Sequence, residues 1–420
     1  MHGRSTTIDT TIILIIGGAS AIAFYMAWSI GANDVANSMA SAVGAKAITF
    51  KQAVLIAGVL NFIGAVFVGE HVVETVKGGI VNIDMIPCGN ILLLGFVSSL
   101  LAAAIWVTLS TWFEMPISTT HSVIGALIGF GVIASGLTCV QWGKVGSVAA
   151  SWVLSPLFGC ILAFFVFKII VKTIFAKERP VESAKIVGPI IIGFTAFLIS
   201  SSLLLKTSLS EKIGLTEMPQ ILVASFIIAV ITIALSIYRF RKIEAKGPED
   251  YATVESIFRK LQVGTSCYVA FAHGANDVAN AIGPVAAIIP LAEKGAMDPT
   301  AMVPYWLLAL GGVGITIGCL TWGRRVMRTV GERITSLTNT RGFSVDFGAA
   351  TTVLVASKLG LPISTSHTVV GAVIGVGLAR GLEAVDLSVI KKIVVSWLLT
   401  LPVAAATSIG IFLCLKFIFI

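Results

Sequence analysis

The stretch from Trp28 to Ala40 reads WSIGANDVANSMA, and seven of its letters occur a second time in the chain. Residues 31–37 and 274–280 both read GANDVAN. Each copy lies in an apolar segment, where a carboxylate is costly because neither lipid nor apolar side chains can solvate it. A repeated motif with one Asp and two Asn in such surroundings indicates a functional site.

The composition indicates a membrane protein. Of the 420 residues, 56% are hydrophobic and only 12% are charged, which is too little polar material to cover a soluble globule. Residues 147–167 carry no charge and match the roughly 20 apolar residues that cross a bilayer. Continuous apolar runs exclude an outer-membrane barrel, whose strands would alternate. We therefore predict an all-α polytopic protein in the lipid bilayer of the cell membrane.

The positive charges are gathered in short loops, so the net charge of +8 indicates topology and not binding to nucleic acid. Basic clusters occur at 168–185, 239–260 and 324–341, and the positive-inside rule places them in the cytoplasm. The segments 70–84 and 206–217 lack a basic excess and fit the outside. We interpret the N-terminal apolar run as the first membrane helix and not as a cleaved signal peptide.

A second motif is also duplicated. Residues 115–131 read MPISTTHSVIGALIGFG, and residues 361–377 read LPISTSHTVVGAVIGVG. The two motifs occur in the same order in both parts of the chain, which indicates an internal duplication. The apolar run 11–44 is too long for one straight crossing, so we expect a helix broken near Gly31–Asp34.

The loop charges predict that the two halves are inverted. We expect five crossings in each half and two between them, or about 12 transmembrane segments with both termini outside. In this division residues 1–175 form the first repeat, 176–256 a linker with two scaffold spans, and 257–420 the second repeat. The PIST segments either cross the membrane or re-enter it as hairpins. Inverted repeats with broken helices or membrane hairpins are typical of secondary transporters.

The four motifs, GANDVANS with PISTTHSVIGALIGFG and GANDVAN with PISTSHTVVGAVIGVG, resemble the paired signatures of the inorganic phosphate transporter (PiT) family. That family comprises sodium- or proton-coupled phosphate symporters. The resemblance covers nearly the whole chain except the two middle spans, 186–205 and 219–238. It implies a carrier that imports inorganic phosphate, with Na⁺ or H⁺ as the coupling ion.

The PIST motifs predict an anion site. Pro116 and Pro362 are each followed by three hydroxyl residues; proline opens a helix, and Ser or Thr caps one. A helix N-terminus inside the membrane offers free N–H groups and the positive end of the helix dipole. The alternative is that the hydroxyls only satisfy the backbone at a kink. The predicted phosphate ligands are Asn33, Asn37, Ser118, Thr119, Thr120, Asn276, Asn280, Ser364, Thr365 and Ser366.

The GANDVAN motifs predict the cation sites, because amide and carboxylate oxygens are hard ligands that suit Na⁺. Neither motif contains Lys or Arg, so a buried phosphate must be neutralised by helix ends and co-transported cations, which couples the two. Helix capping by Asp34 and Asp277 is one alternative, and proton transport by the same carboxylates is another. The predicted Na⁺ ligands are Asn33, Asp34, Asn37, Ser118, Asn276, Asp277, Asn280 and Ser364.

Three histidines and one glutamate lie beside the motifs. His121 and His367 follow the hydroxyl triplets, and we expect their rings to be hydrogen-bonded within the hairpins rather than to bind ligand. His273 precedes the second GANDVAN where Ile30 precedes the first. Glu114 has Gly360 as its counterpart, and we expect it to face solvent.

Other functions are disfavoured. Ser118 and His121 resemble part of a hydrolase triad, but no GxSxG elbow is present and duplicated inverted active sites would be required; we predict no enzymatic activity and no cofactor beyond Na⁺ as coupling ion. The six cysteines form no CxxC pair, which gives no indication of a metal site. A sulfate permease of the same fold, an anion channel and a homodimer formed through the scaffold spans remain open.

Overall fold

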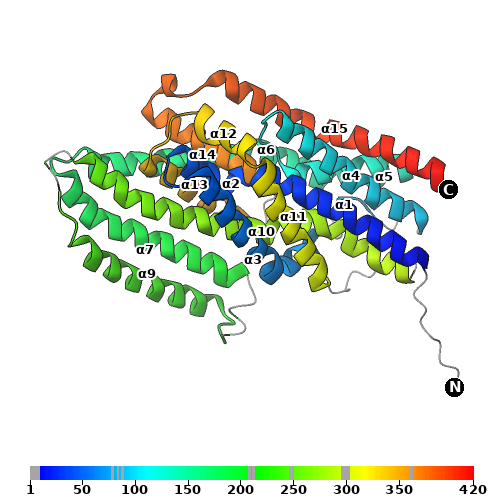
Figure 1. Cartoon of the computed structure of the whole chain (residues 1–420), viewed down its shortest axis with the longest axis horizontal. Helices are drawn as coiled ribbons and strands as arrows, with labels where there is room; N and C mark the ends of the chain where they lie inside the picture. The colour runs from blue at the N-terminus through cyan, green and yellow to red at the C-terminus, as the bar shows by residue number, and fades with distance from the viewer. Residues whose placement is uncertain are drawn as a thin grey trace.

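The computed structural model describes residues 10–76, 80–82, 85–86, 89–206, 210, 213–245, 247, 250–294, 303–358 and 363–420, and these form a helical bundle (Figure 1). Pro362 and Gly360, together with most of the segment 77–88, lie outside the described residues. The helices are α1 (Thr10–Asp34), α2 (Ala36–Gly44), α3 (Phe50–Val76), α4 (Asn90–Trp112), α5 (Thr119–Ser135), α6 (Trp142–Ile170), α7 (Pro180–Lys206), α9 (Met218–Phe240), α10 (Tyr251–Lys294), α11 (Tyr305–Trp322), α12 (Arg324–Arg328), α13 (Asn339–Lys358), α14 (Thr365–Arg380) and α15 (Leu387–Phe419).

The predicted all-α polytopic class is confirmed. Among the described residues, nine helical segments are long and apolar enough to cross a membrane. The PIST helix α5 has 17 residues and is therefore about 25 Å long, which is shorter than a full crossing. Helices α13 and α14 are not among the nine either, so the count of twelve spans stays a prediction.

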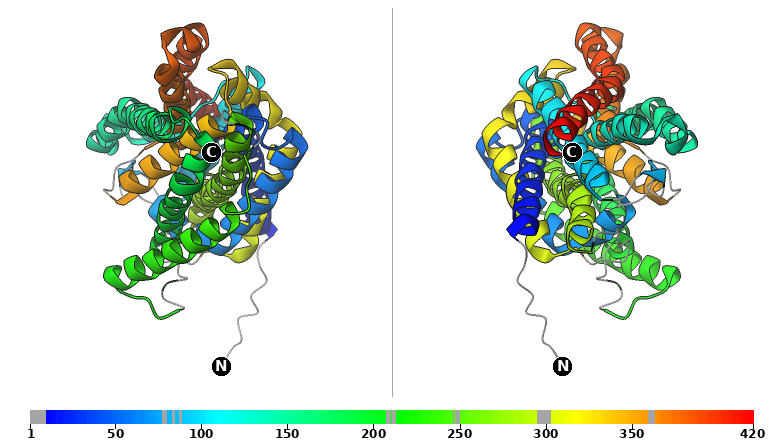
Figure 2. Two further views of the ribbon diagram at one scale, coloured as in Figure 1. Left: turned by 90° about the vertical axis from the view of Figure 1, so that its left-hand side faces the viewer. Right: turned by 90° about the vertical axis from the view of Figure 1, so that its right-hand side faces the viewer.

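The first and second halves of the chain are interleaved. Helix α1 packs on α11 and α3 packs on α10; in the same way, α5 packs on α15 and α6 packs on α14. Each of these pairs joins a helix that precedes residue 171 to one that follows residue 250. Figure 2 shows both halves contributing to one body, while α7 and α9 pack on each other at its periphery.

Glycines allow two of these crossings to be very close. A Cβ on Gly31 would lie 1.9 Å from the carbonyl oxygen of Ile315 on α11, and a Cβ on Gly274 would lie 2.2 Å from that of Asn61 on α3. Real side chains cannot approach a backbone oxygen so closely, so only glycine lets the helices meet there. The glycine that opens each GANDVAN therefore seats its helix on a neighbour from the other half.

The two GANDVAN copies differ in backbone. In the first copy α1 ends at Asp34 and α2 starts at Ala36. Val35 between them keeps a helical φ of −55° and ψ of −26°, so this is a local irregularity one residue beyond Gly31–Asp34 and not the broken helix that was expected. The carbonyl of Val35 accepts the N–H groups of Ser38 and Met39 and the Ser38 hydroxyl. The second copy lies within α10, a helix of 44 residues that continues past the motif.

Helices α4 and α5 form a hairpin. They pack along each other, and the connection turns at Glu114, which has a φ of 61°. The side chain of Glu114 is 31% exposed and ion-paired with Arg333. It therefore reaches solvent at the end of the span, as expected, and the turn also directs it toward the basic segment after α12. Helix α1 begins and α15 ends at the same end of the bundle (Figure 1), although which side of the membrane this is stays a prediction.

Candidate functional site

The hydroxyl triplets stand at the start of two helices, as the motif predicted. Ser118 caps α5, its Oγ accepting the backbone N–H of His121 at 3.3 Å. Ser364 caps α14 in the same way, accepting the N–H of His367 at 3.3 Å. The expected capping is thus confirmed, and the first hydroxyl of each triplet is engaged by its own helix.

This geometry predicts the effect of removing a cap. Ser118→Ala is expected to lower the stability of the protein by about 1 kcal/mol, because the N–H of His121 loses its acceptor. Thermal unfolding of the detergent-solubilised protein measures this. Ser118→Asn is the matched control, since Asn is an equally good N-cap. An unchanged melting temperature in Ser118→Ala would contradict the capping role.

Asp34 connects the starts of the two helices. Its Oδ2 accepts the hydroxyl of Thr119 at 2.8 Å, and its Oδ1 accepts the hydroxyl of Ser366 at 3.2 Å. The side chain of Asp34 is 1% exposed. One buried carboxylate from the first GANDVAN therefore holds a hydroxyl from each PIST motif, so three of the four motifs meet at Asp34, Thr119 and Ser366, which we call the junction.

Asparagines of the two GANDVAN copies make equivalent contacts with the opposite halves. The amide of Asn37 donates to Ser366 at 2.9 Å, and the amide of Asn280 donates to Thr120 at 3.1 Å. Asn37 also lies 3.5 Å from the hydroxyl of Thr365. Each half thus supplies an amide to the hydroxyl triplet of the other.

A histidine lies between the two aspartates. His273 Nε2 is 2.7 Å from Asp277 Oδ2 and 3.9 Å from Asp34 Oδ2, and one ligand atom from each of the three residues lies within 4.8 Å of the others. The other ring nitrogen, Nδ1, is 2.6 Å from Asn61 Oδ1. Since an amide oxygen only accepts hydrogen bonds, Nδ1 carries a proton. The amide of Asn276 donates to Asp277 Oδ1 at 2.9 Å.

The histidine is part of a difference between the two halves. Gly274 packs on Asn61, and His273 contacts the same Asn61; Gly31 packs on Ile315, and the residue before Gly31 is Ile30. Both isoleucines are fully buried. The crossing of α10 with α3 therefore carries a polar pair where the crossing of α1 with α11 carries two isoleucines, so the junction is asymmetric although its motifs are duplicated.

Asn33 contacts other residues than those of the junction. Its amide donates to the hydroxyl of Thr111 and the carbonyl of Met115, both at 3.0 Å, and its Oδ1 accepts the N–H of Ile117 at 3.3 Å. These partners belong to the end of α4 and the turn before α5. Asn33 thus holds the α4–α5 turn, whereas Asp34, Asn37, Thr119, Thr120, Asn276, Asp277, Asn280, Thr365 and Ser366 meet at or beside the junction.

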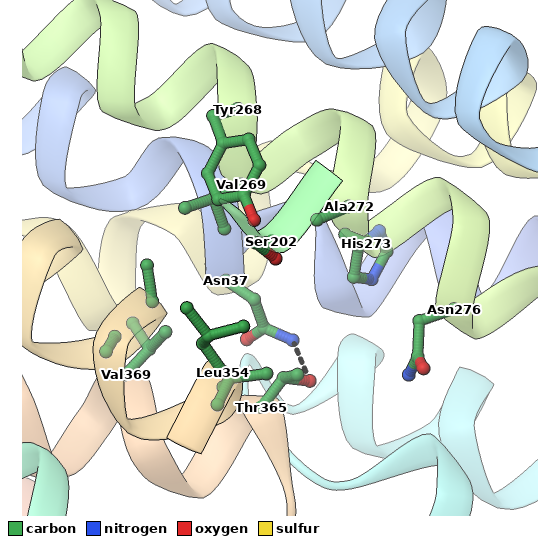
Figure 3. Close-up of a pocket in the computed structure, with 13 residues that line it drawn as sticks. Asn37, Ser202, Tyr268, Val269, Ala272, His273, Asn276, Leu354, Thr365 and Val369 are labelled. Carbon is green, nitrogen blue, oxygen red and sulfur yellow. Dashed lines mark hydrogen bonds between the residues drawn. The ribbon is translucent and has the colours of Figure 1, made fainter. Parts of the chain in front are cut away.

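A cavity adjoins the junction (Figure 3). It has a volume of about 70 Å³. Asn37, His273, Asn276 and Thr365 line one part of it, and Ser202 of α7 and Tyr268 of α10 line another. Asn276 is exposed within this otherwise buried helix segment, so its amide is available to a ligand in the cavity.

The histidines behind the hydroxyl triplets pack as rings. His121 and His367 lie edge to face with centroids 5.1 Å apart, and His367 stacks on Trp397 at 3.9 Å. Within the part of the chain that is described, neither ring nitrogen of His367 has a hydrogen-bond partner. The expectation of a hydrogen-bonded ring is therefore wrong for His367, because stacking on α15 replaces it; the indole of Trp397 in turn donates to the carbonyl of Pro116.

Asp346 is a buried carboxylate outside the duplicated motifs. It lies on α13 and accepts the hydroxyls of Ser41 on α2 and of Ser266 on α10, the latter at 2.6 Å; Thr265 is 3.4 Å away. It joins the two helices that carry GANDVAN to α13. Asp346 could have been predicted from the sequence, because it is the single acidic residue in the apolar segment 343–357 and such residues are often functional.

The fold and the site define a polytopic α-helical membrane protein whose duplicated polar motifs meet inside the bundle. The family model of the phosphate transporter family matches residues 30–408. A Thermococcus kodakarensis protein named as a phosphate permease is 52% identical over 395 residues, 93% of this chain and 95% of that protein. The chloroplastic inorganic phosphate transporter 2-1 of Arabidopsis thaliana is 41% identical, over 92% of this chain and 70% of that protein.

A solved structure described as the sodium-dependent phosphate transporter superposes with a TM-score of 0.87 and 45% identity, covering 96% of this chain and all of that one. The chain belongs to the phosphate transporter family.

Proposed function

We propose that the protein is a secondary active transporter that imports inorganic phosphate together with Na⁺ by alternating access. The observation that carries the proposal is the position of Asp34, whose two oxygens hold hydroxyls from the N-termini of α5 and α14. Phosphate would bind where these helix ends and the amides of Asn37 and Asn280 converge. Helix N-termini present N–H groups and a positive dipole to such an anion.

The charge balance of the junction supports coupling. The four motifs contain no Lys or Arg, and none lines the described cavity. A multiply charged anion placed beside Asp34 and Asp277 would be repelled unless cations came with it. Bound cations would therefore raise the affinity for phosphate, and phosphate the affinity for cations, by the same factor.

The available ligands support Na⁺ as the coupling ion. Asp34 and Asp277 offer carboxylate oxygens, and Thr119, Ser366 and Asn276 add hydroxyl and amide oxygens beside them; hard oxygen donors suit Na⁺. The similar solved structure is described as sodium-dependent.

His273 favours the alternative of proton coupling. Its Nε2 lies 2.7 Å from Asp277 Oδ2, a distance at which a shared proton holds the pair together.

The arrangement of helices supports alternating access. The reciprocal pairs α1 with α11 and α3 with α10 are what two exchanged repeats would produce, and we propose the division into 1–175, 176–256 and 257–420 on that basis. In this proposal the repeats rock against the α7–α9 hairpin, which supplies Ser202 to the cavity wall. Ser202 of α7 and Tyr268 of α10 face the cavity together at this boundary. The exposed apolar side chains of α9, among them Phe226 and Ile231, would face lipid or a second copy.

Uptake of radiolabelled phosphate into proteoliposomes tests the proposal. At clamped pH we expect concentrative uptake with Na⁺ outside, none with K⁺, and no competition from excess sulfate. Sulfate differs from phosphate in having no proton to donate near neutral pH, so the ionised Asp34 would reject it. Uptake driven only by a proton gradient would show that H⁺, and not Na⁺, is the coupling ion. Competition by sulfate would show that the site also accepts sulfate and would contradict selectivity for phosphate. Passive flux that does not saturate would favour a channel.

A further inference from the structure

The cavity beside the junction has two chemically different parts. The amides and the imidazole of Asn37, Asn276 and His273, with the hydroxyl of Thr365, form the polar part. The remaining wall is apolar apart from Ser202 and Tyr268, and it consists of side chains from α10, α13 and α14: Val269, Ala272, Ala349, Ala350, Val353, Leu354 and Val369. In Figure 3 Leu354 and Val369 lie on the side of Asn37 away from Asn276.

A cavity with one polar and one apolar part is a poor match for inorganic phosphate, which has four equivalent oxygens. Inorganic phosphate needs hydrogen-bond donors or cations around each oxygen, and an oxygen that faces an apolar wall loses its water without compensation. An anion held by Thr365, Asn37 and Asn276 can satisfy the oxygens on that side. The fourth oxygen of the tetrahedral anion points toward Leu354 and Val353 of α13. It gains no hydrogen bond there, because these side chains are apolar.

We propose that this cavity also binds alkylphosphonates, tetrahedral anions in which a short alkyl group replaces one oxygen of phosphate. The proposal rests on the proposed function, because Asn37 and the N-terminus of α14 at Thr365 belong to both sites. The alkyl group lies against Leu354, Val353 and Val369. An alkylphosphonate thereby competes with phosphate for the junction.

The volume of the cavity limits the alkyl group. Burial of each methylene improves affinity about fourfold, since it removes apolar surface from water. At about 70 Å³ the cavity is much smaller than the about 150 Å³ that accommodates benzene in an engineered apolar cavity. Affinity should therefore rise from methyl- to ethyl- to propylphosphonate, and phenylphosphonate should fall below that series.

The experiment measures inhibition of sodium-driven phosphate uptake in proteoliposomes by methyl-, ethyl-, propyl- and phenylphosphonate at one clamped pH. The quantity compared is the inhibition constant of each phosphonate divided by the half-saturation concentration of phosphate in the same variant. Leu354→Trp fills the apolar part of the cavity and is expected to flatten the series, raising the ratio for propylphosphonate about tenfold. Val355→Trp is the matched control, because Val355 is the next residue on α13 and is 50% exposed on the outside of the bundle.

The outcomes separate this proposal from the proposed function. Normal phosphate uptake with a flat series in the wild-type chain would overturn the alkylphosphonate site and leave phosphate transport intact. A rising series that Leu354→Trp does not change would also overturn it, because the alkyl group would then lie elsewhere. If Leu354→Trp does not fold, Ala350→Leu fills the same wall with a smaller change. Absence of phosphate uptake by the wild-type chain would contradict the proposed function and this inference together.

Discussion

Replacing Asp34 by Asn is expected to lower sodium-driven phosphate uptake by about 100-fold or more. The carboxylate accepts two hydroxyls, from Thr119 and Ser366, and hydrogen bonds to a charged group contribute about 1.5–3 kcal/mol each. An amide of the same shape keeps one acceptor and loses the charge that would hold a cation. The measurement is initial uptake into proteoliposomes at several Na⁺ concentrations.

The matched control is Asp386→Asn, the same change at an exposed position. Asp386 caps α15 by accepting the N–H groups of Ser388 and Val389, and Asn caps helices equally well. Uptake by this variant should equal that of the wild type. If Asp34→Asn retains both the wild-type rate and its Na⁺ dependence, Asp34 has no role in coupling.

The members of the site that sequence alone could predict are those that lie in contiguous repeated motifs. Asp34, Asn37 and Ser366 could be named because each motif combines polar residues, an apolar setting and a second copy. The sequence also predicted the helix starts after Ser118 and Ser364, since N-capping is a local property of the backbone. The all-helical membrane class followed from hydropathy for the same reason.

The residues that the motifs did not reveal are those joined by packing between distant segments. Asn61 reaches His273 across 212 positions, and Ser41 reaches Asp346 across 305. Neither contact has a local signature, because it exists only once α3 lies on α10 and α2 lies beside α13. The same packing decides that the polar pair lies at the crossing of α3 with α10, whereas Ile30 and Ile315 lie at the crossing of α1 with α11. A duplication in sequence therefore predicted more symmetry than the junction has.

Asn33 shows that membership of a motif does not by itself identify a ligand-binding side chain. Its position beside Asp34 predicted a ligand, and whether it binds phosphate or Na⁺ stays a prediction. In the structure both ends of its amide are engaged by Thr111, Met115 and Ile117. Composition could not distinguish a side chain that meets a ligand from one that holds the neighbouring turn in place.

Gly31→Ala is expected to destabilise the protein by about 3 kcal/mol or more and to abolish uptake, because overpacking costs grow when the obstacle is backbone. The new methyl group would lie 1.9 Å from the carbonyl oxygen of Ile315, so α1 and α11 must separate. Asp34 is one turn from Gly31 on the same helix, and the separation would also displace its carboxylate from Thr119 and Ser366. Thermal unfolding in detergent and uptake are the two measurements.

Gly17→Ala is the control on the same helix, since a Cβ at Gly17 meets nothing within 4 Å. Alanine is favoured over glycine inside a helix by roughly 0.5–1 kcal/mol, so this variant should be at least as stable as the wild type and should transport normally. Gly274→Ala and Gly264→Ala repeat the comparison on α10, where the first clashes with Asn61 and the second meets nothing. Wild-type stability in both Gly31→Ala and Gly274→Ala would contradict the close crossings. Loss of uptake at full stability would instead show that these crossings set the geometry of the aspartates rather than the strength of the fold.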